Sequence, residues 1–424
     1  MFNYRIISFF YYVIERSDKV LTTKKTLNNY KDIFLLGFIS IVIGIIIGTI
    51  DTLFGKVLLE ITNIRNNHAF QLIPFLPLAG ILIIFAYSKI GKNSIKGMSL
   101  IFSARFEGDT IPKRLIPLAM VSTWLTHLFG GSAGREGVAV QIGGTVAHSI
   151  GKQLSINNSS KILLIAGMAA GFAGLFQTPI AATFFAMEVF TAGSVEYGAL
   201  LPCIISSFVA SYTSKALGLE EFGINFNCSL ELNVHLILKM VLLGILFGIV
   251  GGLFAYTSNL SKKFLSKNIS NPMLRIFIIG CILSVLLLFL HKGRYAGSGS
   301  NLIEAAFFNE KIYRYDWLFK FLLTILTMSA GFQGGEVVPL FSIGASLGAV
   351  ISPILGLPID FVSALGYTAV FGSATNTILA PIFIGGEVFG YDYLPYFFIV
   401  SAIAYVFNGN KSIYSAQKIL DDFN

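Results

Sequence analysis

Residues 134–148 read GREGVAVQIGGTVAH, and residues 334–348 read GGEVVPLFSIGASLG. Each segment places a glutamate, Glu136 or Glu336, two residues after a glycine and directly before an apolar run of helical length. The shared arrangement predicts two helices that begin in the same way, one in each half of the chain. In membrane proteins with internal repeats, such helix starts face a binding site near the bilayer midplane.

A second pair of acidic residues supports an internal repeat. Glu188, in AMEVF, follows Glu136 by 52 residues, and Glu387, in GGEVF, follows Glu336 by 51 residues. Duplication of one unit accounts for both intervals and for the glycine-rich context. The spacing alone leaves open whether the second half is inverted relative to the first.

The composition indicates an integral membrane protein. Hydrophobic residues make up 54% of the chain and charged residues 12%, whereas soluble domains carry about 25% charged residues. Crossing a bilayer takes about 20 mostly apolar residues, and the chain holds long apolar stretches at Phe34 to Ile50, Leu72 to Tyr87, Met240 to Tyr256, Ile276 to Leu290 and Leu318 to Met328. We predict an all-α polytopic protein with one transmembrane domain over residues 1–424, repeat halves at roughly 34–217 and 233–422, and no cytoplasmic regulatory domain.

The net charge of +8 is spread between the apolar segments and forms no cluster suited to nucleic acid. Basic residues precede the first span and follow the second, at Lys19, Lys24, Lys25, Lys31, Lys89, Lys92 and Lys96. This pattern is typical of cytoplasmic flanks beside anionic lipid, so it predicts a cytoplasmic N-terminus in a plasma membrane. The apolar run Ile6 to Ile14 lacks a cleavage site and is interpreted as a retained interfacial helix.

The segment GGSAGREGVAVQ, from Gly130 to Gln141, carries the strongest signal for chemistry. Its glycines leave backbone N–H groups uncovered at a helix N-terminus, where the helix dipole favours an anion. A glutamate inside the membrane is costly, which makes Glu136 a functional candidate. Its carboxylate could occupy the place of an anion and leave on protonation. The structural alternative is that Glu136 stabilises its helix and pairs with Arg135.

Other functional classes find less support in the sequence. The three cysteines and five histidines show no metal-ligand spacing, so we expect no metal and no cofactor. The chain has no HExxH motif, and an intramembrane enzyme is therefore disfavoured.

Four segments in order resemble the CLC family of chloride channels and antiporters. The GREG of residues 134–137 resembles the family's GREGP signature, and GGEVVP at 334–339 resembles its GGxFAP helix start. GSGSNLI at 297–303 and GNKSIYSA at 409–416 resemble two further family segments. The resemblance covers roughly residues 34–422. It implies a CLC-type inverted repeat of about eighteen tilted and discontinuous helices, and a homodimer with one pathway in each subunit.

The same resemblance assigns the site residues. Glu136 corresponds to the gating glutamate that exchanges protons and anions, and Tyr414 to the central tyrosine whose hydroxyl group binds the anion. Without the resemblance, Tyr414 would be interpreted as an interfacial aromatic residue. The implied anion-binding residues are Gly134, Arg135, Gly137, Val138, Met98, Val337, Val338 and Tyr414.

Departures from the chloride pattern resemble the fluoride-exporting branch of the family. Met98 stands near the place of the GSGIP serine, Val138 replaces the proline of GREGP, and Glu336 opens the second helix. Val189 follows Glu188 where chloride antiporters carry a second glutamate. One position differs from that branch, because Val338 stands where a threonine is expected.

These features predict fluoride export driven by inward proton movement. Fluoride is strongly hydrated, and a protonated Glu336 would offer the short O–H donor that a dehydrated fluoride needs, since burial favours the neutral form of a carboxyl group. The structural alternative is an ionised Glu336 that caps its helix. At the level of function, a chloride/proton antiporter and a passive anion channel remain as alternatives.

Overall fold

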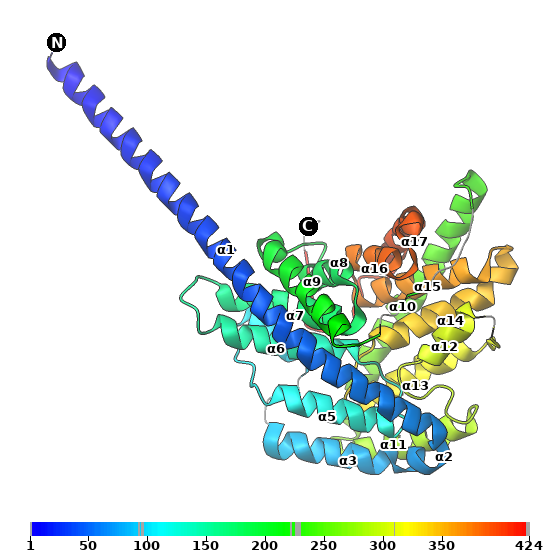
Figure 1. Cartoon of the computed structure of the whole chain (residues 1–424). Coiled ribbons are helices and arrows are strands. Elements are labelled where there is room, and N and C mark those ends of the chain that lie inside the picture. Colours follow the sequence, from blue (N-terminus) through cyan, green and yellow to red (C-terminus); the bar gives the residue numbers. More distant parts are fainter. Residues whose placement is uncertain are drawn as a thin grey trace.

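The computed structural model describes residues 2–91, 94, 97–220, 223–224, 230–308 and 310–420, with side chains from residue 31 onward. These residues form an α-helical body from which the long N-terminal helix projects (Figure 1). The α-helices are α1 Phe2–Asn67, α2 Ala69–Leu72, α3 Leu76–Ala86, α4 Met98–Phe106, α5 Leu115–Leu128, α6 Glu136–Gly151, α7 Ser159–Phe176, α8 Pro179–Glu188, α9 Leu200–Ala216, α10 Val234–Asn268, α11 Pro272–Phe289, α12 Ser300–Phe307, α13 Asp316–Ala330, α14 Val337–Leu355, α15 Ile359–Thr375, α16 Leu379–Phe389 and α17 Leu394–Val406.

The prediction of an all-α membrane protein is confirmed. Six described helices are long and apolar enough to cross a membrane: Lys31–Asn67, Ala69–Gly91, Ser159–Phe176, Val234–Asn268, Pro272–Phe289 and Val337–Leu355. Helices α1, α3 and α11 expose many large apolar side chains, whereas α7 and α14 are largely buried. Exposed apolar faces around a buried helical interior are what a lipid solvent requires.

The N-terminal part of the chain differs in form from the predicted short interfacial helix. The backbone continues without a break from Phe2 to Asn67 as the single helix α1, so the run Ile6 to Ile14 is its first part. The side chains of this run lie outside those that the structure describes. Its placement at the membrane interface stays a prediction.

Glycines allow two helix pairs at the centre to approach each other closely. Gly143 of α6 and Gly167 of α7 pack backbone against backbone, and Gly344 of α14 and Gly366 of α15 do the same. A Cβ atom on any of these four glycines would clash with the carbonyl group of its partner. These contacts hold α6 and α14, the two helices that begin beside Glu136 and Glu336, in the protein interior.

Replacing Gly344 by alanine is expected to lower the free energy of unfolding by about 3 kcal/mol, at the upper end for overpacking, because the clash is with rigid backbone. Gly198 is the matched control, since a Cβ atom there meets nothing within 4 Å. Thermal unfolding of Gly344→Ala and Gly198→Ala in detergent checks the prediction. Equal midpoints for the two variants would contradict it.

Two glutamates, the buried Glu188 and the half-buried Glu387, tie α8 and α16 together by capping each other's helix. Glu188, at the end of α8, accepts hydrogen bonds from the backbone N–H groups of residues 378–380 at the start of α16. Glu387, near the end of α16, accepts from Ile180 and Ala181 at the start of α8, at 2.9 and 2.8 Å. The two acids therefore pair with backbone donors of the opposite helix.

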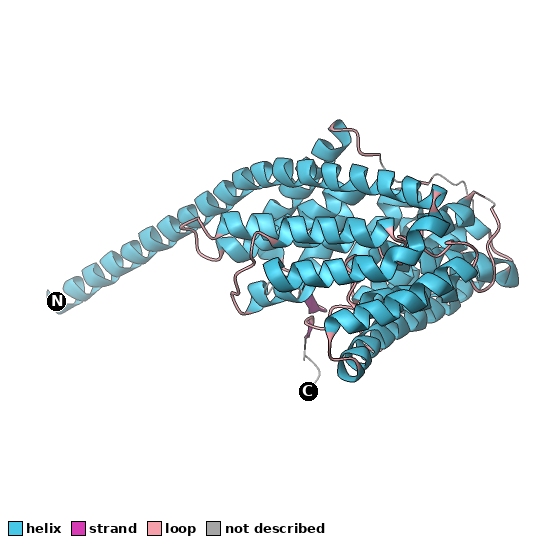
Figure 2. Cartoon of the chain, turned by 90° about the horizontal axis from the view of Figure 1, so that it is seen from below, coloured by secondary structure: helices cyan, strands magenta, loops and turns pink. Residues whose placement is uncertain are grey.

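The C-terminal segment is fixed to the body by a short parallel pair of strands (Figure 2). Strand β1, Thr191–Ala192, pairs with β2, Lys418–Ile419, with Thr191 opposite Lys418. This contact joins the segment that carries Tyr414 to the loop after α8.

Candidate functional site

The loops that precede α6 and α14 lie side by side although they are 200 residues apart in sequence. Gly134 N–H donates to Gly335 O at 2.6 Å, and Gly335 N–H donates to Gly134 O at 2.8 Å, in an antiparallel bridge. A Cβ atom on Gly137 would lie 3.3 Å from the Gly335 Cα atom. Small residues on both sides permit this approach, which brings the N-termini of two buried helices together.

Glu136 is the first residue of α6, and its side chain is 1% exposed. Its Oε2 atom accepts a hydrogen bond from the Arg135 backbone N–H at 3.1 Å, and its Oε1 atom accepts from Arg135 Nε at 3.4 Å. Glu136, Arg135, Val338 and Tyr367 line a cavity of about 230 Å³, which we call the Glu136 cavity. The carboxyl group thus occupies a helix N-terminus at the wall of a cavity, in a place where an anion would be stabilised.

Glu336 lies at the N-cap position of α14 and faces a different space. With Met98, Gln141 and Tyr414 it lines a cavity of about 330 Å³, which we call the Glu336 cavity. Its Oε1 atom lies 3.2 Å from Lys262 Nζ in an ion pair, and the two side chains are 14% and 37% exposed. Although Glu336 occupies the N-cap position, its side chain makes no capping hydrogen bond to α14 and instead pairs with Lys262 at the cavity wall.

Tyr414 and Met98, which are far apart in the sequence, both line the Glu336 cavity. Tyr414 is buried and stacks on Phe102, with ring centroids 5.7 Å apart. Met98 begins α4 and is half-buried. Ser99, the next residue, also lines the cavity and supplies a hydroxyl group there.

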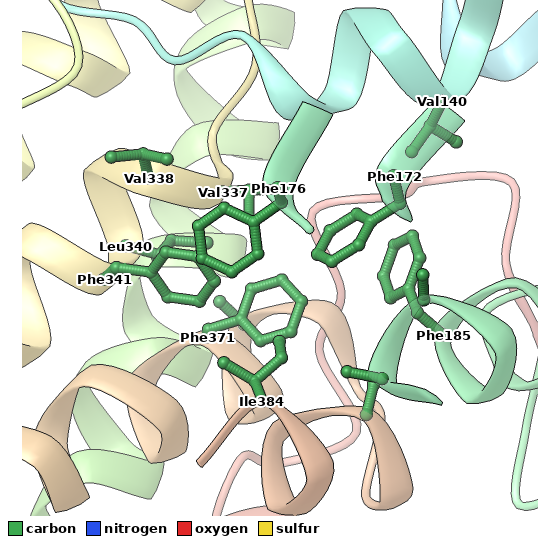
Figure 3. Close-up of a cluster of buried hydrophobic side chains, with 14 of the residues drawn as sticks. Val140, Phe172, Phe176, Phe185, Val337, Val338, Leu340, Phe341, Phe371 and Ile384 are labelled. Carbon is green, nitrogen blue, oxygen red and sulfur yellow. The ribbon is translucent and has the colours of Figure 1, made fainter. Parts of the chain in front are cut away.

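A band of aromatic rings runs from the Glu136 cavity to the Glu336 cavity. Phe176, in the wall of the first cavity, contacts Phe172, which contacts Phe185, with ring centroids 5.7 and 5.2 Å apart. Phe185 in turn lies 6.4 Å from Tyr414, in the wall of the second cavity. Figure 3 shows these phenylalanines beside the side chains at the start of α14.

The three valines that the sequence proposed lie at the two helix starts. Val138 and Val337 are buried, and Val338 is buried beside the Glu136 cavity, which it lines. Figure 3 shows Val337 and Val338 next to Phe176 and Phe341. Apolar side chains cannot bind an anion directly, so a valine here could offer an anion only its backbone N–H group. The N–H group of Val138 already donates to Arg135 O at 3.0 Å.

The sequence analysis missed several polar residues of the site, among them Lys262 and Gln141. Lys262 is near the end of α10, and Gln141 is one turn into α6; both line the Glu336 cavity. Gln141 falls inside the quoted GREG segment, so its spacing from Glu136 could have indicated it. Lys262 lies in an ordinary helix without a motif, and no local signal points to it.

The chain is similar in sequence to proteins of known family. A family model described as "Voltage gated chloride channel" matches residues 79–409. The chain belongs to this family, the CLC family. A chloride/fluoride channel protein of Pseudomonas syringae pv. tomato is 33% identical over 385 residues, which are 89% of this chain and 85% of the relative. An H(+)/Cl(-) exchange transporter of Vibrio cholerae is 25% identical and covers 84% of this chain and 81% of its own length.

Solved CLC structures share the fold. The crystal structure of a CLC-type fluoride/proton antiporter superposes with a TM-score of 0.90 at 51% identity, covering 91% of this chain and 98% of the other. A slow cyanobacterial Cl-/H+ antiporter gives a TM-score of 0.76 at 20% identity, covering 88% and 95%. The prediction of a CLC-type all-α fold is confirmed, and helices α1 to α17 come close to the expected number.

Proposed function

We propose that this CLC protein is a fluoride/proton antiporter, which exports fluoride by using inward proton movement. The observation that carries the proposal is Glu136, a buried carboxyl group at the first residue of α6, in the wall of a cavity and beside the start of α14. The similarity to a CLC-type fluoride/proton antiporter at 51% identity supports fluoride as the anion. We propose that the protein acts in transport and is not an enzyme.

Glu136 would couple the two ions by exchanging places with the anion. As a carboxylate it occupies the helix N-terminus, held by the N–H and guanidinium groups of Arg135. Once protonated it loses most of that attraction, because the helix dipole and Arg135 favour negative charge. It then leaves the site, and an anion can enter. One group therefore carries a proton in one state and yields to an anion in the other.

The anion would bind between the two helix starts and the Glu336 cavity. We propose backbone donors near Gly134, Arg135, Gly137, Val138, Val337 and Val338, with Tyr414 and Met98 at the Glu336 side. Glu336 would act as a second pore glutamate that offers an O–H donor to dehydrated fluoride when protonated. Its ion pair with Lys262 would hold it away from the anion while it is ionised.

The position of the Glu136 cavity along α1 indicates the side of the membrane from which protons would reach Glu136. Leu58, Leu59 and Thr62, from the C-terminal part of α1, line this cavity. If the N-terminus is cytoplasmic, as the basic flanks predict, this part of α1 lies on the outer side of the membrane. Protons would then reach Glu136 from outside, as inward proton movement requires.

Family membership and composition support a proposal for the assembly and location. We propose a homodimer in a bacterial plasma membrane, in contact with lipid, with one pathway in each subunit. We also propose that residues 34–217 and 233–422 are inverted repeat halves of a single domain over residues 1–424. The matching positions of Glu136 and Glu336 and the reciprocal caps of Glu188 and Glu387 support this division.

A chloride/proton antiporter or a passive anion channel of the same family is the second candidate. Glu188 is engaged by backbone N–H groups of α16, and Val189 follows it, so the sequence there offers no second carboxyl group to relay protons. A channel needs no such relay. The chloride/fluoride channel protein of Pseudomonas syringae pv. tomato supports this candidate, because that relative is named a channel.

Ion efflux from liposomes tests the proposal. Purified protein is reconstituted, and fluoride, chloride and pH electrodes record efflux together. We expect fluoride efflux with proton uptake in a fixed ratio, and much slower chloride efflux. Chloride moving as fast as fluoride would overturn the choice of anion, and fluoride efflux without proton movement would make the protein a channel.

A further inference from the structure

A basic pocket lies at the level where three membrane-spanning segments end. The spans Lys31–Asn67 and Pro272–Phe289 end, and the span Ala69–Gly91 begins, beside a cavity of about 300 Å³, which we call the Arg65 pocket. Its wall comes from the last turn of α1, from the start of the second span, and from the loop between α11 and α12. The ends of membrane spans lie at the border of the hydrocarbon core, which is the level of the lipid headgroups.

The Arg65 pocket carries positive charge that the described residues do not balance. Arg65, Lys292 and Arg294 line it, whereas no aspartate or glutamate does. Arg294 forms an ion pair with the buried Asp316 at 2.8 Å. Arg65 and Lys292 have no carboxylate within 4 Å in the part of the chain that the structure describes. The pocket therefore keeps the positive charges of these two residues.

Arg65 is the buried member of this set, at 5% exposure. Its Nη2 atom donates to Asn66 Oδ1 at 2.8 Å, and its Nη1 atom donates to His127 O at 3.2 Å, in the last turn of α5. Both acceptors are neutral, and the dipole of α5 offsets only part of the charge. A buried guanidinium without an anion beside it is costly. Its planar fork of N–H donors matches the oxygen atoms of a phosphate group.

Exposed apolar side chains around the pocket indicate that its ligand comes from the membrane. Ile64, Phe70 and Phe289 precede or follow lining residues in the sequence and are 48%, 60% and 85% exposed. Exposed apolar groups beside polar ones mark sites of membrane contact. A lipid whose headgroup enters the pocket would lay its acyl chains against these side chains. Because the pocket has an excess of positive charge, an anionic headgroup suits it better than a zwitterionic one.

We propose that the Arg65 pocket binds the phosphate group of an anionic phospholipid, held by Arg65 and Lys292. This inference does not depend on which ion the protein transports. The lipid would be linked to the ion site through His127, whose carbonyl group accepts from Arg65 and whose Nε2 atom lies 3.3 Å from Gly134 O. Gly134 belongs to the bridge that joins the loops before α6 and α14. A bound lipid should therefore stabilise the folded protein.

Thermal unfolding of the full-length protein in detergent micelles tests the inference. Added phosphatidylglycerol, which is anionic, should raise the unfolding midpoint by several degrees, and zwitterionic phosphatidylcholine should raise it much less. Lys292→Gln should increase the half-saturating concentration of phosphatidylglycerol about fivefold, the effect of one basic residue beside anionic lipid. Arg65→Gln should increase it further. If Arg65→Gln does not fold, Lys292→Gln carries the test, because Lys292 is exposed.

Two controls separate this site from general effects of charge. Lys56 is an exposed lysine of α1 that does not line the pocket, so Lys56→Gln should respond to phosphatidylglycerol as the wild type does. Inorganic phosphate should not stabilise the protein at concentrations at which phosphatidylglycerol saturates. Equal effects of the two lipids, or equal shifts in Lys292→Gln and Lys56→Gln, would overturn the inference. Stabilisation by inorganic phosphate as strong as that by phosphatidylglycerol would overturn the lipid as the source of the phosphate group.

Discussion

Replacing Glu136 by glutamine is expected to abolish proton movement through the protein. Glutamine keeps the size of the side chain and can still accept hydrogen bonds from Arg135, but it cannot bind or release a proton. Proton uptake during fluoride efflux should fall by about 100-fold or more, the contribution typical of a proton-transferring side chain. Any fluoride efflux that remains should no longer respond to a pH gradient. Paired fluoride and pH electrodes on the same liposomes measure both quantities.

Glu60→Gln provides the matched control for this variant. Glu60 is an exposed glutamate of α1 and lines neither cavity, so removing its charge should leave the ratio of protons to fluoride unchanged. Coupled proton uptake that survives in Glu136→Gln would show that another group carries the proton. Glu136 would then have the structural role that the sequence also allowed, as a helix-stabilising partner of Arg135.

The parts of the site that the sequence predicted are those with a local signal. A glycine-rich turn, a glutamate and an apolar run mark a buried helix start without further information, and Glu136 and Glu336 were located in this way. The antiparallel bridge between Gly134 and Gly335 has no local signal, because it joins loops from the two halves of the chain. The internal repeat predicted that such helix starts face a binding site, and the structure supplies the contact between their loops.

The sequence offers no reason to single out Lys262, because it lies in the polar last turns of α10, among Ser261, Lys263 and Lys267, where no motif distinguishes it from its neighbours. The long apolar stretches predicted from the sequence do not include α7, and α14 was predicted only as the apolar run that follows Glu336. Helices α7 and α14 contain many small residues, such as Gly167, which make them less apolar than the Leu-rich spans. They are nevertheless more buried than those spans.

The second large effect on transport is expected when Glu336 is replaced. Two variants distinguish the loss of its carboxyl group from the loss of its ion pair with Lys262. Glu336→Gln removes the carboxyl group and breaks the pair with Lys262, and Lys262→Met breaks the same pair but keeps the carboxyl group. Because Lys262 is partly exposed, the pair should contribute at most about 1 kcal/mol, and Lys262→Met should slow fluoride efflux by no more than about fivefold. Glu336→Gln should slow it by about 100-fold, because the amide N–H of glutamine is a weaker donor than the acidic O–H and cannot take up or release a proton.

Fluoride and chloride efflux measured for both variants distinguish the two roles of Glu336. If the carboxyl group is a fluoride donor, Glu336→Gln should lose fluoride efflux much more than chloride efflux, because the strongly hydrated ion depends more on a charge-assisted hydrogen bond. If Glu336 only caps α14, the two variants should slow both anions alike, and the loss should appear as reduced thermal stability. Equal rates in Glu336→Gln and Lys262→Met would therefore remove Glu336 from the transport mechanism and leave Glu136 as the single coupling carboxyl group.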